Sequence, residues 1–344
     1  MFLVDEKNKK RWAKLTIFSA LVAIWFRLDA TPALTAAELY VRYVNPSLVS
    51  KTFHDGTVTL ITGASDGFGA EIAKQLCTKT STNLILMARR LEKMEEVRQY
   101  CRESSQINSD VKIVLVEADV TKGTEAQTQW IQNALKILGK REVDIAIINA
   151  GRGYAGSVDE TPEELIRDIM DLNFMGAVST VKAVLSTYTD SGREKHMVAM
   201  SSAAAKLPVP LAAGYSASKA ALNAFFDSLR AEQLGIRVTT VCPGPFYSGI
   251  RENSRRDNAS LNPNAPPQEE EKEGLMAVER AVRLTLAGII ASPSWLFHEL
   301  WFSPQPILTF TAIGQYIPDL AKYVGKPVGG CGGSTICEAA RKKK

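Results

Sequence analysis

The chain has 344 residues, of which 45% are hydrophobic and 23% are charged. This composition is typical of a folded globular protein, and it excludes a disordered, collagen-like or coiled-coil chain. The net charge of +4 is small, so no nucleic-acid partner is expected, because such proteins carry a basic face on the folded body. The five cysteines are an odd number, which argues against a disulfide framework. No Cys and His spacing is that of a zinc site, so no metal is expected.

A membrane-associated segment is predicted over residues 1–30, followed by a linker over residues 31–55. Lys and Arg crowd positions 7–14, and the 12 residues 15–26 (LTIFSALVAIWF) carry no charge. A spanning helix needs about 20 apolar residues. The alternatives are a short or tilted crossing, an anchor lying in the interface, a cleaved secretory signal, and a helix packed on the domain. A crossing would place the following domain in the lumen, because the basic flank stays in the cytosol, whereas a surface anchor would leave the domain in the cytosol.

Strands alternate with helices from residue 57 onward. The strands are apolar throughout rather than alternating, which is typical of a parallel sheet covered on both faces. They are predicted over residues 57–62, 83–88, 111–117, 143–148, 196–200 and 236–241. The helices are predicted over residues 70–79, 91–103, 124–138, 162–187 and 215–233. The predicted fold class is therefore α/β, a Rossmann-like doubly wound parallel sheet in a single domain over residues 56–303.

The chain loses this regularity after residue 251. Residues 252–275 are polar, rich in Pro and without periodicity, so they are predicted to form a mobile surface loop beside the substrate. Aromatic residues and prolines crowd residues 295–323, and the prolines rule out one long helix. We interpret residues 304–344 as a C-terminal helical lid with a polar tail. Ordinary core packing is the alternative for the aromatic residues.

A Gly-rich motif, TGASDGFG at residues 62–69, follows the first predicted strand and precedes a helix. Gly63 permits a tight turn, and Gly67 and Gly69 let the backbone approach a pyrophosphate. The free N–H groups at the helix N-terminus attract phosphate. A plain turn is the alternative, but the position in the first β-α-β unit favours a dinucleotide site. Further contacts are expected from Ser65, Asp66 and Phe68.

The end of the second predicted strand indicates which dinucleotide binds. An acidic residue there binds the 2′-hydroxyl of NAD(H), and an arginine accommodates the 2′-phosphate of NADP(H). The sequence is Ala88-Arg89-Arg90, and a guanidinium pairs with phosphate in a bidentate manner, so Arg89 predicts NADP(H). Two solvated arginines at a helix start are the alternative. The carboxylate of Asp66 would repel the 2′-phosphate unless it faces away.

A candidate catalytic set follows the fifth predicted strand. Tyr215 and Lys219 open a helix, and Ser202 lies thirteen residues before Tyr215. Residues i and i+4 share a helix face, so the Lys219 ammonium is expected to lower the pKa of the Tyr215 phenol from about 10 toward neutrality. Ser202 is expected to donate a hydrogen bond to the carbonyl oxygen of a substrate. The Tyr-x-x-x-Lys spacing alone is weakly specific, and its position after the nucleotide half strengthens the interpretation.

Together these motifs resemble those of the short-chain dehydrogenase/reductase family. The matching pieces are TGASDGFG (62–69), Asp119-Val120, Asn149-Ala150-Gly151, Asn173, Ser202, YSASK (215–219) and Pro243-Gly244. The resemblance implies that Tyr215 is the proton donor and acceptor, that Lys219 also holds the nicotinamide ribose, and that Ser202 orients the carbonyl. It also implies a proton-relay water held by Asn173. The implied cofactor contacts are Asp119 and Val120 at the adenine, Asn149 beside the sheet centre, and Pro243, Gly244 and Ser248 at the nicotinamide.

Segments outside the catalytic motifs narrow the resemblance. The basic and apolar N-terminus, CPGPFYSGIREN at residues 242–253 and the aromatic C-terminal segment resemble a membrane-attached microsomal branch, dehydrogenase/reductase member seven, near the 11-beta-hydroxysteroid dehydrogenases. This implies an NADP(H)-dependent enzyme of the endoplasmic reticulum membrane that interconverts a carbonyl and an alcohol on a lipophilic steroid, retinoid or xenobiotic. The alternatives are a 3-ketoacyl or 3-ketosphinganine reductase of lipid synthesis and a non-catalytic NADP(H)-binding regulator. The sequence does not decide whether the chain forms a homodimer.

Overall fold

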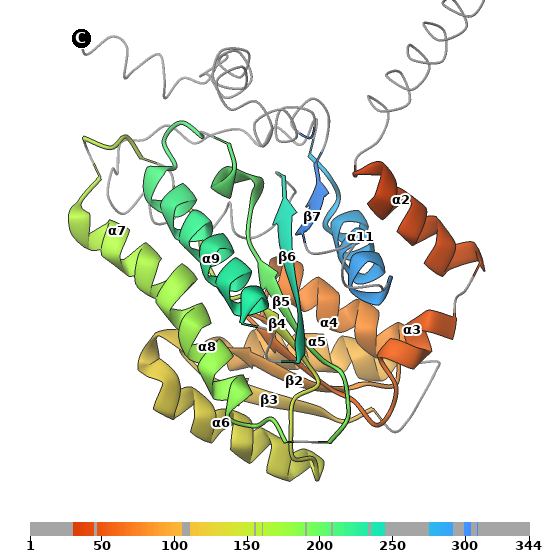
Figure 1. Ribbon diagram of the computed structural model, residues 1–344. Helices are drawn as coiled ribbons and strands as arrows, with labels where there is room; N and C mark the ends of the chain where they lie inside the picture. Colours follow the sequence, from red (N-terminus) through yellow and green to blue (C-terminus); the bar gives the residue numbers. More distant parts are fainter. Residues whose placement is uncertain are drawn as a thin grey trace, which may run out of the picture.

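A seven-stranded parallel β-sheet forms the centre of the molecule (Figure 1). The computed structural model describes residues 30–44, 47–104, 111–154, 156–159, 161–189, 191–207, 209–232, 235–244, 275–291, 299–303 and 308. The strand order is β3-β2-β1-β4-β5-β6-β7. The strands are β1 (Val58–Thr62), β2 (Asn83–Ala88), β3 (Ile113–Glu117), β4 (Ile145–Ile148), β5 (Lys195–Met200), β6 (Ile236–Pro243) and β7 (Glu299–Phe302). The predicted Rossmann-like α/β sheet is confirmed, and β1 to β6 begin and end within two residues of the predicted strands.

Helices cover both faces of the sheet, which explains why the strands are apolar on both sides. In β1, Ile61 belongs to one buried cluster, whereas Val58 and Leu60 belong to the other. The first cluster is covered by α2 (Pro32–Leu39), α4 (Gly67–Lys79), α5 (Leu91–Ser104) and α11 (Val278–Ile290). The second is covered by α6 (Gly123–Leu138), α8 (Gly176–Leu185) and α9 (Ala213–Ala231).

The helix predicted over residues 162–187 contains a π-helical turn. Helix α7 (Glu163–Met170) continues into the π-helical turn η3 (Asp171–Met175), which continues into α8. Such turns occur frequently at functional sites, because one extra residue changes the direction of the side chains. Here the turn contains Asn173, which is completely buried.

The segment predicted as a linker carries structure of its own. It contains α2, the π-helical turn η1 (Tyr40–Val44) and α3 (Ser47–Thr52). Helix α2 lies against α11 (Figure 1), and Glu38 forms an ion pair with Arg280 there. Ala30 forms an isolated bridge with Phe302 of β7. Helices α2 and α3 therefore pack on the domain. Helix α11 and strand β7 are two further elements that the sequence did not predict.

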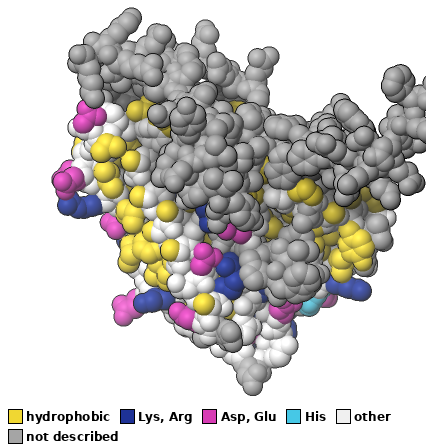
Figure 2. Space-filling view, turned by 45° about the horizontal axis from the view of Figure 1, so that its top comes forward, with side chains coloured by type: hydrophobic (Ala, Val, Ile, Leu, Met, Phe, Trp, Pro, Cys, Tyr) yellow, Lys and Arg dark blue, Asp and Glu magenta, His cyan; other side chains and the backbone are white. Residues whose placement is uncertain are grey.

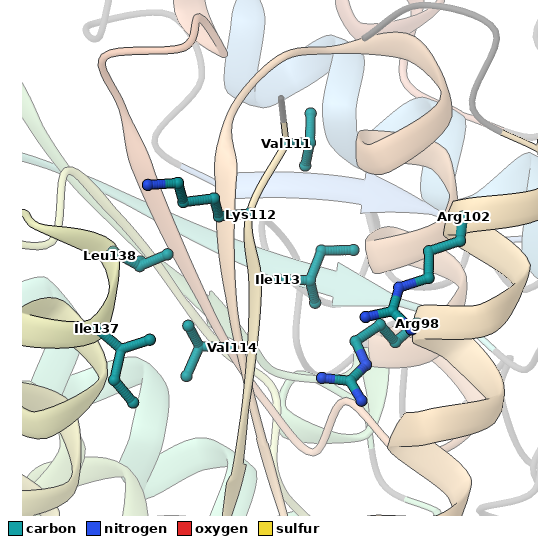
Figure 3. Close-up of a pocket in the computed structure, with 8 residues that line it drawn as sticks. All are labelled: Arg98, Arg102, Val111, Lys112, Ile113, Val114, Ile137 and Leu138. Atoms are coloured by element: carbon teal, nitrogen blue, oxygen red, sulfur yellow. The ribbon is translucent and has the colours of Figure 1, made fainter. Parts of the chain in front are cut away.

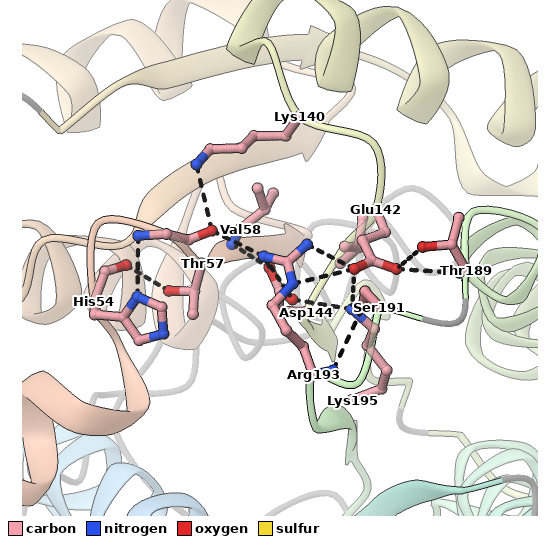
Figure 4. Close-up of polar contacts among 12 residues, drawn as sticks. His54, Thr57, Val58, Lys140, Glu142, Asp144, Thr189, Ser191, Arg193 and Lys195 are labelled. Atoms are coloured by element: carbon pink, nitrogen blue, oxygen red, sulfur yellow. Dashed lines mark hydrogen bonds and ion pairs between the residues drawn. The ribbon is translucent and has the colours of Figure 1, made fainter.

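A buried ionic network joins the amino ends of the central strands (Figure 4). Lys195 Nζ lies 2.7 Å from a Glu142 oxygen and 3.0 Å from an Asp144 oxygen. Arg193 also pairs with Glu142, and the Val58 amide donates to Asp144 over 2.9 Å. Burial would raise the pKa of Glu142, but hydrogen bonds from Lys195, Ser191, Arg193 and Thr189 outweigh it and hold this pKa far below its usual range. The network therefore fixes the starts of β1 and β5 to the segment that enters β4.

The expectation about disulfides needs a correction. Cys77 in α4 and Cys101 in α5 form a disulfide. An odd number of cysteines argues against a fully paired framework, but it does not prevent two facing helices from pairing theirs. The free Cys242 is buried.

Several predicted features lie outside the described residues. These are the membrane segment up to residue 29, Ser248, the polar loop up to residue 274 and the C-terminal lid apart from residue 308. Within the described ranges, no helix is both long and apolar enough to cross a bilayer. The same ranges contain no group of three or more His, Cys, Asp or Glu side chains that could hold a metal ion.

Candidate active site

The predicted site residues gather at the carboxyl ends of the strands. From β1 the strand order runs to β2 and β3 on one side and to β4, β5 and β6 on the other. In open α/β sheets this reversal creates a crevice beyond the strand ends, where ligands bind. The Gly-rich motif follows β1, Asn149 follows β4, and Ser202 follows β5. The topology therefore brings the nucleotide motif and the catalytic candidates to one edge of the sheet.

The Gly-rich turn has the backbone geometry that a dinucleotide site needs. Gly63 and Gly67 have φ values of 68° and 53°, a region that suits glycine because it lacks a Cβ. A Cβ on Gly69 would meet the Gly63 carbonyl oxygen at 2.5 Å, so only glycine lets α4 start this close to the turn. The side chain of Phe68 packs in the core. The N-terminal amides of α4 are therefore placed as in helix termini that bind phosphate.

Asn149 joins the Gly-rich turn to the end of β4. Its Nδ2 donates to the carbonyl oxygens of Thr62 and Gly63 over 2.9 and 3.3 Å. The Thr62 hydroxyl accepts from the amides of Asn149 and Ala150 over 2.9 and 3.0 Å. These bonds fix the separation of the two strand ends between which a ligand would lie.

The two arginines after β2 differ in their contacts. Arg90 pairs with Asp66 over 3.2 Å and donates to the Ser65 hydroxyl over 3.2 Å. Asp66 also caps α4 by accepting from the Gly67 amide over 2.7 Å. The repulsion expected between Asp66 and a 2′-phosphate is thus offset by Arg90, a contact that the sequence analysis did not assign. The second arginine of the adjacent pair Arg89-Arg90 was the feature of the sequence that could have predicted this contact.

Asp119 lies beside the first of these arginines. Its Oδ1 accepts from the Thr121 amide and hydroxyl over 3.0 and 2.9 Å. Partial burial raises the pKa of Asp119, but the Thr121 hydrogen bonds and the charges of Arg89 and Lys122 outweigh it, so this pKa lies below its ordinary value. Val120 is buried against the junction of η3 and α8, where a Cβ on Gly176 would meet it at 2.8 Å. The ionised Asp119 and the Arg89 guanidinium therefore share the predicted adenosine end.

The structure brings Ser202, Tyr215 and Lys219 together. The Ser202 hydroxyl lies close enough to the Tyr215 phenol to act on its pKa, and its Oγ accepts from the Ala204 amide over 3.1 Å. Lys219 Nζ lies 6.0 Å from the centre of the Tyr215 ring and donates to the Met200 carbonyl over 2.8 Å. A phenol, a hydroxyl and an ammonium thus meet at the carboxyl end of β5.

The pKa values in this group correct one expectation. Burial raises the pKa of Tyr215, although the Ser202 hydroxyl acts in the opposite direction. The predicted lowering by Lys219 is not found in this arrangement, because the ammonium is bound to the Met200 carbonyl rather than to the phenol oxygen. Burial also lowers the pKa of Lys219 to about 8. The phenol is therefore protonated at neutral pH, as a proton donor must be.

Asn173 orders the protein around this group. Its Oδ1 accepts from the Arg152 amide over 2.9 Å, and its Nδ2 donates to the Arg152 carbonyl and the Ser218 hydroxyl, both over 3.0 Å. A Cβ on Gly151 would meet Asn173 Oδ1 at 3.0 Å and Lys219 Nζ at 3.4 Å. The π-helical turn therefore ties the segment after β4 to the helix that carries Tyr215. A water held by Asn173 stays a prediction.

Glu299 connects the catalytic segment to the last strand. It pairs with Lys206 over 3.2 Å and accepts from the Cys242 thiol over 3.4 Å and from the Trp301 indole. Lys206 follows the turn that begins at Ser202, and Cys242 precedes Pro243 at the end of β6. Sequence reasoning missed Glu299, because β7 was not predicted. Gly244 donates to the Phe302 carbonyl over 2.8 Å, which fixes the ends of β6 and β7 together.

Two loops meet beside the catalytic group. The Gly156 amide donates to the Leu211 carbonyl over 2.7 Å. Leu211 has a φ of 63°, a left-handed conformation that is uncommon for a bulky residue and tends to occur at functional sites. Val158 and Val209, near these contacts in the chain, are exposed. The loops after β4 and β5 are therefore joined by a hydrogen bond, and both expose apolar side chains.

A pocket of about 290 Å³ lies elsewhere, on the edge strand β3 (Figure 3). Its lining combines apolar and basic side chains: Arg98, Arg102, Val111, Lys112, Ile113, Val114, Ile137 and Leu138. Strand β3 ends the sheet opposite β7, so this pocket is separate from the group around Tyr215.

The family model described as short chain dehydrogenase matches residues 57–259. "Dehydrogenase/reductase SDR family member 7" from Homo sapiens is 33% identical over 276 residues, which cover 79% of this chain and 77% of that protein.

Solved structures share the fold. An alcohol dehydrogenase from Thermococcus sibiricus complexed with 5-hydroxy-NADP has a TM-score of 0.59 and 23% identity, and the match covers 72% of this chain and 97% of that chain. A short chain dehydrogenase from Mycobacterium paratuberculosis bound to NAD has a TM-score of 0.60 and 22% identity, with coverage of 74% and 98%. Similar folds therefore bind either form of the dinucleotide.

Proposed function

Because this chain belongs to the short-chain dehydrogenase family, whose model matches residues 57–259, we propose that it is an NADP(H)-dependent oxidoreductase that interconverts a carbonyl and an alcohol on a lipophilic small molecule. The observation that carries the proposal is the meeting of Ser202, Tyr215 and Lys219 beside the Gly-rich turn. A chain that only bound the dinucleotide would have no chemical need for this group.

The cofactor supplies or accepts the hydride when it is bound. In the direction of reduction, the Ser202 hydroxyl donates a hydrogen bond to the substrate carbonyl oxygen and holds it near Tyr215. The Tyr215 phenol gives its proton to that oxygen as the hydride reaches the carbon, so that the C=O double bond becomes an alcohol. The phenolate that remains must take up a proton before the next cycle, and Lys219, with its pKa lowered to about 8 by burial, lies 6.0 Å from the centre of its ring. Oxidation of an alcohol uses the same groups in reverse.

The preference for NADP(H) rests on Arg89 and Arg90. Arg90 neutralises Asp66, and Arg89 lies close enough to Asp119 to lower the pKa of its carboxyl. A 2′-phosphate beside β2 would therefore meet guanidinium donors, with the nearby Asp66 carboxylate already neutralised by Arg90. Because the similar structures include NADP-type and NAD complexes, the proposal depends on these charges and not on the comparisons.

We also propose attachment to the endoplasmic reticulum membrane, and exposed apolar surface supports contact with lipid and with a lipophilic substrate. Leu39, Tyr40 and Tyr43 in α2 and η1 are exposed, the last by 68%. They follow the apolar run of residues 15–26 in the sequence. Figure 2 shows further apolar patches divided by charged side chains on one face of the molecule. Exposed apolar groups of this kind favour contact with lipid or with a lipophilic ligand.

The test is a panel of steroid, retinoid, ketosphinganine, 3-ketoacyl and quinone carbonyls offered to the purified full chain with NADPH. Oxidation of NADPH by the lipophilic ketones or aldehydes, with formation of the alcohol, is expected. Turnover of only the ketoacyl or ketosphinganine compounds would move the assignment to lipid synthesis. A folded chain that binds NADPH and turns over no carbonyl would contradict the proposal.

A further inference from the structure

The disulfide between α4 and α5 lies in the core of the dinucleotide half. Cys77 and Cys101 are 24 residues apart in the chain, and their Cα atoms are 5.7 Å apart. Their exposed fractions are 3% and 2%, and both belong to the apolar cluster that includes Leu76 and Val97. The bridge is therefore enclosed by the packing of α4 on α5.

A metal site and a redox-active centre do not explain this pair. No third His, Cys, Asp or Glu ligand joins the two cysteines in the described part of the chain. Reactive cysteines lie in partly exposed, electropositive surroundings, whereas these two are buried among apolar side chains. Cys77 also lies ten residues into α4, about 15 Å along the axis from its phosphate-facing end. The pair fits a structural crosslink.

We infer that Cys77 and Cys101 are oxidised in the cell, and that the catalytic domain therefore lies on the lumenal side of the membrane. Protein disulfides persist in oxidising compartments and are rare in the cytosol. A bridge that is buried on both helices forms as they pack, so the domain must fold where thiols are oxidised. The two thiols lose two electrons to a disulfide of an exchange partner, which becomes a dithiol, and their protons pass to it or to solvent.

The positive charge before the N-terminal apolar segment is consistent with a catalytic domain on the lumenal side of the membrane. Lys and Arg at positions 7–14 precede the apolar residues 15–26, and a basic flank stays on the cytosolic side when such a segment crosses. A single crossing then places everything from residue 30 onward in the lumen. The choice of side rests on the membrane attachment proposed above, whereas the disulfide itself does not.

The bridge can be read directly by mass spectrometry. The full chain is expressed in eukaryotic cells, denatured in excess N-ethylmaleimide and digested with trypsin without reduction. Cleavage after Lys74, Lys79, Arg98 and Arg102 releases QLCTK and QYCR, which should appear as one linked species. The matched control Cys101→Ala should yield QLCTK carrying N-ethylmaleimide. Recovery of both wild-type peptides as separate N-ethylmaleimide adducts would overturn the inference.

The side of the membrane is tested on sealed microsomes from the same cells. The catalytic domain should resist added protease until detergent opens the vesicles, and digestion before detergent would overturn the lumenal placement. NADPH turnover of the detergent-treated sample is measured in parallel. A protected, disulfide-linked chain without turnover would refute the proposed function alone, while an active chain with free thiols would refute this inference alone.

Discussion

At the amino end of the sheet Lys195 is buried between the carboxylates of Glu142 and Asp144, whereas at the carboxyl end Lys219 is buried against the neutral carbonyl of Met200. Burial of a charge is costly unless opposite charges and hydrogen bonds offset it. Lys195 at the amino end has that compensation. Lys219 at the carboxyl end does not, and burial therefore lowers its pKa to about 8. One end of the sheet therefore holds the strands together, and the other carries a lysine with a strongly shifted pKa, a feature that often marks functional sites.

The largest expected effect is on catalysis at the carboxyl end. Tyr215→Phe removes the proposed proton donor and should lower kcat about 10²- to 10⁴-fold. NADPH affinity and unfolding free energy should stay near those of the wild-type chain. Kinetics, fluorescence titration and urea unfolding measure these quantities. A variant that keeps more than about a tenth of the rate would remove Tyr215 from this role.

A substitution in the ionic network at the amino end of the sheet should lower stability rather than activity. Lys195→Met leaves Glu142 and Asp144 with one fewer cation, and breaking a buried pair typically costs about 3–5 kcal/mol. Urea unfolding should show this loss, while activity per folded molecule stays unchanged. Arg167→Met, which breaks an exposed pair with Glu163, is the control and should change stability by less than about 1 kcal/mol. Equal effects of the two substitutions would contradict the account of the network.

At the carboxyl end, replacing the buried lysine is expected to raise the unfolding free energy rather than lower it. Lys219→Met removes a buried cation that has no carboxylate to compensate it, so it should abolish turnover yet raise stability at pH 7 by roughly 3 kcal/mol. The folded pKa of about 8 lies below the ordinary value of 10.5, so the unfolded chain binds more protons between these values. Wild-type stability should therefore gain a contribution as pH rises through this window, and the variant should lack it. Unfolding curves at pH 7, 9 and 10.5 measure the difference; destabilisation by the variant at pH 7 would contradict it.

A smaller effect is expected at the nucleotide end. Arg89→Asp should weaken NADPH binding roughly 10- to 50-fold, because a charge-assisted contact with the 2′-phosphate is lost. NADH binding should change far less. Arg90→Asp is informative beside it, because it should also disturb the Asp66 cap of α4 and weaken both dinucleotides. Titration of both variants with both dinucleotides measures this, and equal losses for Arg89→Asp would show that Arg89 is structural.

The sequence predicted the sheet well because its strands are apolar throughout. Residues 83–88 were predicted as a strand and form β2, while β4 begins two residues later than predicted, after Asp144 has entered the ionic network. Strand β7 was missed, since four residues beside a Pro-rich aromatic segment carry no pattern of their own. The π-helical turn was missed because a helical period does not reveal one extra residue.

The site was predictable where it follows from local motifs, and not where it depends on tertiary pairing. The Gly-rich turn and the Tyr-x-x-x-Lys spacing lie within single segments. The contacts of Arg90 with Asp66, of Lys206 with Glu299 and of Cys77 with Cys101 join segments far apart in the chain. The pKa of Tyr215 was predicted with the wrong sign, because spacing does not show that the Lys219 ammonium bonds to Met200.

We propose that a hydride passes from NADPH to a carbonyl carbon at the carboxyl end of this sheet, with the proton coming from Tyr215. The most direct measurement uses NADPH carrying deuterium at the transferred C4 position, the purified full chain and the carbonyl panel, with the alcohol product analysed by mass spectrometry. The account predicts one deuterium on the alcohol carbon with the wild-type chain and a much slower appearance of the same product with Tyr215→Phe. Saturating binding of the labelled NADPH without a deuterated alcohol from any carbonyl in the panel would contradict it.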